Sequence, residues 1–155
     1  MAWRIGEILI QEKLISWNQL SESLDEQEKT REFIGEILVR KGFISKPLLY
    51  GALAKQHRMR FVDLDRIRIN RHAIELIPRS IAQKYSIFPV DIQREILYLG
   101  VSSPLKIWPE VELIQMARVR EIQAVLCLPD QIRKMIDEYY GISPSAKSFL
   151  KKDDL

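Results

Sequence analysis

Residues 4–27 read RIGEILIQEKLISWNQLSESLDEQ and residues 33–56 read FIGEILVRKGFISKPLLYGALAKQ, one 24-residue phrase written twice at an offset of 29. Ten of the 24 positions are identical: Ile5/Ile34, Gly6/Gly35, Glu7/Glu36, Ile8/Ile37, Leu9/Leu38, Ile15/Ile44, Ser16/Ser45, Leu20/Leu49, Leu24/Leu53 and Gln27/Gln56. A tandem repeat this dense predicts two copies of one supersecondary unit that pack on each other. A site made by the unit should then occur twice, or lie between the copies and suit a two-fold ligand.

Each copy has the pattern of two helices joined by a short turn. In the first copy, apolar residues recur three and four positions apart over about 4–12 and about 17–28. Ser16 with Gln19 three residues later forms a capping box at the start of the second helix. The second copy predicts helices at about 32–41 and 46–57, with Gly42 as a C-terminal cap and Ser45 as an N-cap. Four helices on one apolar core predict a bundle over residues 1–58.

The remainder predicts a small α/β subdomain over residues 59–141, so the fold class is α+β. Asn70 is expected to cap a helix that Pro78 interrupts and that continues to Tyr85. The other expected elements are strands at about 86–91 and 95–101, a helix over 108–117, a strand over 120–129, and a helix that begins with Asp130 as its N-cap and ends at Gly141. This order gives a sheet of roughly three strands. Residues 142–155 are Ser-rich and charged and are predicted to form a flexible tail.

The composition is that of an ordinary globular protein. The 155 residues are 46% hydrophobic and 29% charged, and no run reaches the roughly 20 apolar residues of a membrane span. The N-terminus does not resemble a signal peptide, and the single Cys127 excludes an internal disulfide, so we expect a cytoplasmic protein without direct membrane insertion. Only 58–72 is locally dense in arginine, and its interleaved aspartates favour a solvated mixed-charge face over a nucleic-acid surface.

The residue pattern contains no recognisable catalytic machinery. A phosphate-binding loop of the type GxxxxGK[ST] is absent from the sequence, and neither His57 nor His72 has a metal-ligand partner at a suitable spacing. Cys127 lies in a predicted buried strand, which favours a structural thiol, and Asp63 and Asp65 beside several arginines favour surface ion pairs. We therefore predict no enzyme activity, no metal and no cofactor.

The repeat and the second half together resemble one known family. It is the N-terminal domain of type II secretion and type IV pilus assembly ATPases, including the subgroup named MshEN. The repeated motif of that subgroup runs RLGxxLxxxGxxxxxxLxxxLxxQ, twice, with a five-residue spacer, which here is 28–32. The downstream phrases FVDLDRIRIN, AIELIPRSIAQKYSIFPV and IDEYYG are similar to the same family. The resemblance covers about residues 3–141.

MshEN domains bind the bacterial second messenger cyclic di-GMP, so the resemblance implies a site for this two-fold dianion. An arginine can stack on guanine or donate two hydrogen bonds to it, and glycine at a helix start lets phosphate approach. A glutamine offers both a donor and an acceptor. By position, the implied ligand-binding residues are Arg4, Ile5, Gly6, Leu9, Lys13, Leu20, Leu24 and Gln27 in the first copy, and Phe33, Ile34, Gly35, Leu38, Gly42, Leu49, Leu53 and Gln56 in the second.

The chain departs from the motif at three places. Lys13 stands where the motif has glycine, and Phe33 stands where it has arginine. Ser102-Ser103-Pro104 replaces a phrase that in the family often reads ADP, so an acidic partner is absent. Loss of a charged hydrogen-bonding partner typically costs about 1.5–3 kcal/mol, so Phe33 should weaken the second half-site by roughly ten- to a hundredfold.

Two functions from different classes are compatible with these residues. The first is a non-enzymatic regulatory module that couples cyclic di-GMP binding to a secretion or pilus machinery, through an ATPase or an inner-membrane platform protein. The alternative is a protein-docking module of the same fold with a degenerate ligand site, which an exposed apolar patch around Trp3 and Trp17 would favour. A DNA-binding helix-turn-helix protein is disfavoured, because no helix gathers Arg, Asn and Gln on one face.

The repeat leaves two questions open. Gly6 and Gly35 indicate a close approach, either by another helix or by a ligand. Gln27 and Gln56 could be solvated helix ends or directed hydrogen bonders.

Overall fold

The computed structural model describes residues 4–105 and 107–141, so Trp3 and the predicted tail lie outside the described residues. Contacts divide the chain into two compact units, Met1–Phe61 and Val62–Leu155. The change in sequence pattern predicted a boundary between residues 58 and 59. Each unit has its own apolar core.

The first unit is a four-helix bundle. Its helices are α1 (Ile5–Gln11), α2 (Trp17–Thr30), α3 (Ile34–Arg40) and α4 (Lys46–Gln56). The predicted capping box is confirmed, because Ser16 Oγ accepts from the Gln19 amide and Gln19 Oε1 accepts from the Ser16 amide. The first helix of each copy packs against the second helix of the other copy, α1 on α4 and α3 on α2. The bundle core consists of the motif leucines and isoleucines with Ala52: Ile8, Leu9, Ile15, Leu20, Leu38, Ile44 and Leu49.

The second unit is built on a three-stranded mixed sheet in the order β1-β2-β3. Strands β1 (Ile87–Gln93) and β2 (Ile96–Val101) form an antiparallel hairpin whose two turn residues, Arg94 and Glu95, both have positive φ. Positive φ at both central residues is the geometry of a tight hairpin turn that matches strand twist. Strand β3 (Glu121–Leu126) runs parallel to β2 and follows the crossover helix α7 (Glu110–Ala117). The α+β class and the small sheet predicted from the sequence are therefore confirmed.

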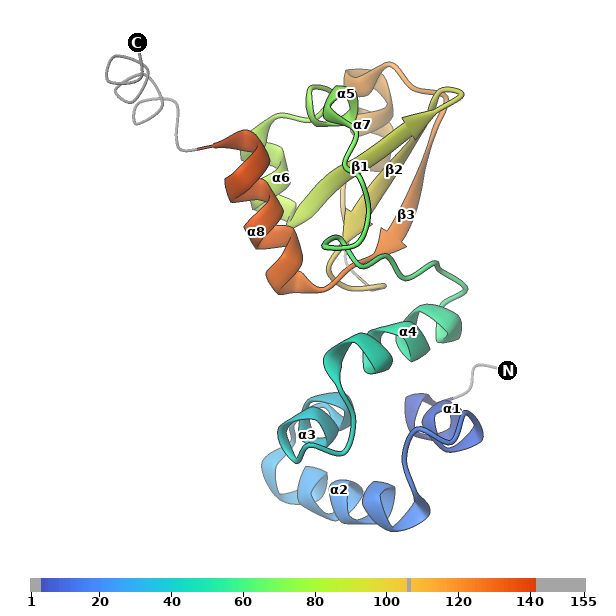
Figure 1. The fold of residues 1–155 in the computed structure, drawn as a ribbon. Helices are drawn as coiled ribbons and strands as arrows, with labels where there is room; N and C mark the ends of the chain where they lie inside the picture. The colour runs from blue at the N-terminus through green and yellow to red at the C-terminus, as the bar shows by residue number, and fades with distance from the viewer. Residues whose placement is uncertain (1–3, 106, 142–155) are drawn as a thin grey trace. The chain divides into compact units, whose positions relative to one another are not determined.

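The described residues of this unit contain three further helices. They are α5 (Arg71–Ile74), α6 (Arg79–Tyr85) and α8 (Pro129–Tyr140), and α8 packs on α6 and on β1 (Figure 1). Asn70 caps α5 as predicted, since its side chain accepts from the His72 amide. The Tyr140 hydroxyl donates to the Ile77 carbonyl at 2.7 Å, which fixes the end of α8 against the segment before α6. The core beneath α8 includes Phe88, Val90, Val125 and Ile132.

One predicted helix cap is wrong. We expected Asp130 to cap α8, but α8 begins at Pro129, and its N-cap is Leu128, which has no capping side chain. Proline is favoured at the first helical position because its φ is already helical and its missing N–H has no helical partner. Asp130 instead lies within the first turn, where a carboxylate still interacts favourably with the helix dipole.

Candidate ligand-binding site

Arg4 and Phe33 occupy the same place in the two copies. Each is the N-cap of the first helix of its copy, with extended backbone angles of φ −69°, ψ 148° and φ −64°, ψ 140°. Neither side chain caps its helix, and both are exposed, with 78% of Phe33 accessible. The repeat therefore presents a guanidinium at one position and a phenyl ring at its equivalent.

The paired glycines are explained by helix packing. A Cβ atom added to Gly6 would lie 2.9 Å from Leu20 Cδ1, and one added to Gly35 would lie 2.9 Å from Leu49 Cδ2. Leu20 and Leu49 are themselves equivalent residues on the second helix of each copy. Of the two alternatives left open by the sequence, the structure shows the close approach of a neighbouring helix, made in the same way twice.

The third motif glycine is a conformational requirement. Gly42 has φ +78°; its amide donates to the Val39 carbonyl and the next amide, of Phe43, donates to the Leu38 carbonyl at 2.9 Å. This pair of bonds is the Schellman ending of a helix, which places its first residue after the cap in the left-handed region. In the first copy Lys13 occupies that position with φ +60°, and the amides of Lys13 and Leu14 make the equivalent bonds. Lys13 thus keeps the turn, at a strain of about 1 kcal/mol.

Gln27 is a directed hydrogen bonder. Its Nε2 donates to the Glu32 carbonyl at 3.1 Å and so joins the end of α2 to the spacer before the second copy. Its equivalent, Gln56, is half-buried at the end of α4.

The remaining candidate residues differ in exposure. Leu9, Leu20, Leu38 and Leu49 are buried in the bundle core, so their side chains contribute to packing. Ile5, Ile34 and Leu53 are half-buried, whereas Leu24 is 44% exposed. The surface that the repeat offers to a ligand therefore comes mainly from Arg4, Lys13, Leu24, Phe33 and Gly42.

Sequence reasoning missed a set of charges that join the two copies. Lys55 Nζ lies 2.6 Å from Glu12 Oε1, and Lys41 Nζ lies 3.1 Å from Glu26 Oε2. Positions 12 and 41 are equivalent in the repeat, and so are 26 and 55. The same two positions therefore pair twice, with both acids in the first copy and both bases in the second. The alignment of the two copies shows these pairs as opposite charges at two equivalent positions, 12/41 and 26/55.

These ion pairs also perturb the groups that make them. A hydrogen bond from Lys41 lowers the pKa of Glu26. Arg40, whose Nη2 lies 3.3 Å from Glu26 Oε1, lowers it further. The hydrogen bond to Glu26 raises the pKa of Lys41. Arg40 also contacts Glu32 of the spacer at 2.9 Å, so the α2–α3 junction holds a connected charge network.

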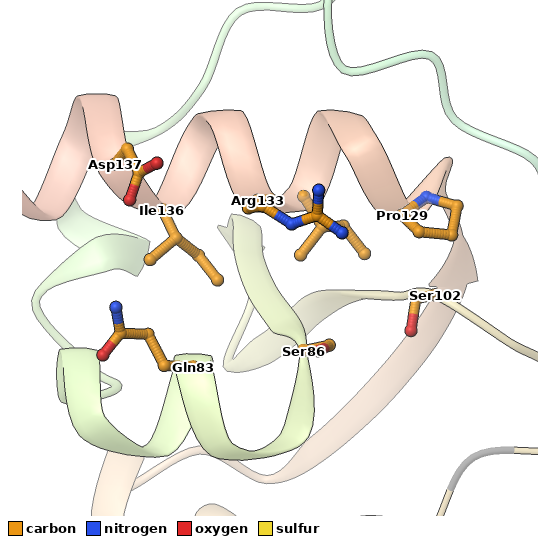
Figure 2. Close-up of a pocket in the computed structure, with 8 residues that line it drawn as sticks. Gln83, Ser86, Ser102, Pro129, Arg133, Ile136 and Asp137 are labelled. Atoms are coloured by element: carbon orange, nitrogen blue, oxygen red, sulfur yellow. The ribbon is translucent and has the colours of Figure 1, made fainter.

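The second unit contains the phrase that replaces the acidic family motif. The Ser103 hydroxyl accepts from the Leu105 amide at 3.2 Å and shapes the loop after β2. Beside this loop, Ser102 lines a cavity of about 170 Å³ between α6 and α8. Figure 2 shows Gln83 reaching from α6 toward α8, with Arg133 extended along α8 above Ser86. The cavity is lined by both a base, Arg133, and an acid, Asp137.

Other residues singled out from the sequence have structural partners. Cys127 is fully buried, and desolvation, with a smaller contribution from Asp63, raises its pKa to about 12, so it stays a thiol at neutral pH. Asp63 pairs with Arg66 at 3.5 Å and Asp65 with Lys134 at 3.2 Å, as surface ion pairs. Across 4–105 and 107–141, no cluster of His, Cys, Asp or Glu could hold a metal ion. The helices in that part of the chain are all too short or too polar to cross a bilayer.

Comparison with known proteins identifies the class as an MshEN domain. The model of that family, described as MshEN domain, matches residues 57–146, and the chain therefore belongs to the MshEN domain family. It is similar to the type IV pilus assembly ATPase PilB of Myxococcus xanthus, with 31% identity over 141 residues that cover 91% of this chain and 25% of PilB. It is also 26% identical over 139 residues, 88% of this chain and 18% of the relative, to bacteriophage adsorption protein B of Escherichia coli K12. The chain thus spans a quarter or less of the length of these relatives.

Two solved structures share the fold. The structure of MshE with cdg (cyclic di-GMP) has 25% sequence identity and a TM-score of 0.72, covering 89% of this chain and 99% of that one. The N-terminal domain of XpsE has 17% identity and a TM-score of 0.54, covering 89% and 94%. The MshE match spans nearly the whole described chain, so both units take part in the likeness.

Proposed function

We propose that this chain is a non-enzymatic regulatory module that binds cyclic di-GMP through its duplicated helical unit. The observation that carries the proposal is the likeness to MshE with cdg over 99% of that chain, together with matched positions in the two copies. Arg4 supplies the charged contact of one half-site. Phe33, exposed at the equivalent N-cap, supplies a ring that can stack on a base but cannot donate a hydrogen bond.

The proposal extends to how the signal is used. The pilus ATPase relatives support an output on a secretion or pilus machinery, through an ATPase or an inner-membrane platform protein. A dinucleotide that contacts both copies would hold α1 and α3 together, and thereby change what the module presents to that partner. The reduced Cys127 in the core suits a cytoplasmic location.

Isothermal titration of the purified chain with cyclic di-GMP tests the proposal. Arg4→Ala should weaken binding at least tenfold, because it removes a charge-assisted contact, and Phe33→Arg should tighten it about tenfold by restoring one. Lys29→Ala is the matched control, since it removes an exposed positive charge of the same unit outside the motif positions. A wild-type chain that does not bind, and that Phe33→Arg does not rescue, would refute the proposal.

A second candidate function is a protein-docking module of the same fold. It is favoured by large apolar side chains exposed on the first unit: Trp17 at 68%, Phe33 at 78% and Leu48 at 51%. A relative named for phage adsorption rather than for ATPase activity also supports use of the module in other settings. No binding by the wild-type chain, with binding restored by Phe33→Arg, would identify a decayed ligand site and favour docking.

A further inference from the structure

The part of the arginine-rich segment that belongs to the second unit, 62–72, contains two arginines, Arg68 and Arg71, for which the structure shows no ion pair among the described residues. Asp63 is engaged by Arg66 at 3.5 Å and by Gln131 Nε2 at 2.8 Å, and Asp65 is engaged by Lys134 at 3.2 Å. The acids of the segment are therefore occupied by other partners. Within the residues that the structure describes, neither Arg68 nor Arg71 lies within ion-pair distance of a carboxylate.

These two arginines line an open pocket of about 490 Å³ together with Ile69, Asn70 and Asp91. The Asp91 carboxylate is already bound by neutral donors. Its Oδ1 accepts from Asn70 Nδ2 at 3.0 Å and from the Ile92 amide at 2.8 Å, and its Oδ2 accepts from Gln93 Nε2 at 2.8 Å. Because these neutral donors bind the Asp91 carboxylate, and no ion pair joins Asp91 to Arg68 or Arg71, both guanidiniums remain available to an outside anion.

One of the two guanidiniums is oriented in advance. Arg71 lies over the Tyr139 ring of α8, with its guanidinium carbon 5.3 Å from the ring centroid. Stacking of this kind restrains the side chain and leaves the in-plane N–H donors free for a carboxylate. Ile67, which precedes Arg68 in the sequence and is 38% exposed, adds an apolar side chain next to this guanidinium donor along the chain.

We propose that Arg68 and Arg71 form a docking site for an acidic segment of a protein partner. The net positive charge of the pocket complements Asp and Glu side chains, and each guanidinium can bind one carboxylate through two parallel hydrogen bonds. The pocket is open, which suits side chains presented by another protein better than a small molecule that needs enclosure. This site uses residues of the second unit alone, and the proposal does not depend on cyclic di-GMP binding by the first unit.

Fluorescence anisotropy with a fluorescein-labelled oligoglutamate peptide at low salt tests the site. Arg68→Gln and Arg71→Gln should each weaken binding about tenfold, as expected for loss of a charge-assisted bidentate contact. Arg66→Gln is the matched control, because it removes the same charge from the same segment but from a residue that is paired with Asp63. We expect the control to change affinity less than twofold. An equal loss in all three variants, or no binding of the wild-type chain, overturns the proposal.

Parallel titrations with pyrophosphate and with phosphatidylglycerol vesicles distinguish the class of partner. Saturable binding of either probe where the peptide fails would overturn the choice of an acidic protein segment. The Arg68→Gln, Arg71→Gln double variant should keep the wild-type affinity for cyclic di-GMP. A parallel loss of that affinity would overturn the functional independence of the two sites.

Discussion

At the scale of single residues, glycines of the bundle serve different purposes. Gly35 lies against Leu49, whereas Gly51, inside α4, has no atom within 4 Å of an added Cβ. We predict that Gly51→Ala stabilises the protein by about 0.5–1 kcal/mol, because alanine restricts the unfolded chain and favours helix. Gly35→Ala should destabilise by about 1 kcal/mol, since overpacking of roughly 1–3 kcal/mol exceeds that gain. Urea denaturation measures both, and equal stabilisation would contradict the packing role of Gly35.

The two copies also differ at one buried position of their second helices. Ser23 is fully buried and its hydroxyl has no hydrogen-bond partner, while the equivalent residue in the second copy is the buried Ala52. We predict that Ser23→Ala stabilises the protein by about 1–2 kcal/mol, because it removes an unsatisfied buried hydroxyl and raises helix propensity. Thermal unfolding provides the measurement. Ala52→Ser is the reciprocal control and should destabilise by a similar amount, and a neutral effect of both would count against this account.

At the scale of elements, the charges at positions 12/41 and 26/55 favour the helix pairing that the structure shows. The first copy carries acids at both positions and the second carries bases, so α1 is matched to α4 and α3 to α2. We predict that Glu12→Lys, which places a lysine opposite Lys55, lowers stability by roughly 0.2–1 kcal/mol. Adding Lys55→Glu should restore it, because the pair is then re-formed in the opposite sense. Denaturation of the two single variants and the double variant gives a double-mutant cycle. If the two changes in unfolding free energy simply add in the double variant, Glu12 and Lys55 do not interact.

The elements that could be predicted from the sequence are those specified by local signals. Ser16 with Gln19 locates the start of α2, and Gly42 locates the end of α3, because each acts on backbone groups within a few residues. The prediction that Asp130 caps α8 was wrong because Pro129 provides a stronger local start for this helix.

Contacts between elements were harder to predict. The paired glycines indicated a close approach, but only the packed structure shows that Leu20 and Leu49 make it. The charge pairs require knowing that helices of different copies face each other. For the candidate site, the repeat identified equivalent positions such as Arg4 and Phe33, whereas exposure, which distinguishes surface positions from core leucines, came from tertiary packing.

At the scale of the whole molecule, the two units hold different titrating groups. In the first unit the hydrogen bond from Lys41 lowers the pKa of Glu26, so this interaction stabilises above the unfolded value of 4.5 and is lost as pH falls through the folded pKa. In the second unit burial raises the pKa of the Cys127 thiol from 9.0 to about 12 and also raises that of the Tyr140 hydroxyl. Above pH 9 the unfolded thiol loses its proton while the folded one keeps it, so stability falls as pH rises.

We therefore predict that mild alkali weakens the second unit first. The full change at Cys127 corresponds to roughly 4 kcal/mol at high pH. In the first unit, the pKa of Lys41 is raised above its unfolded value of 10.5. The stabilisation by the Lys41 ion pairs is therefore complete below pH 10.5 and is lost only as the pH rises through the folded pKa. Urea titrations followed by two-dimensional NMR of methyl groups, at pH values between 9 and 10.5, should show the midpoint falling for residues of 62–141 but not for those of 4–61. Cys127→Ala, although less stable at neutral pH, should lose much of this pH dependence because it has no thiol to ionise; an unchanged slope would show that other groups drive the alkaline loss.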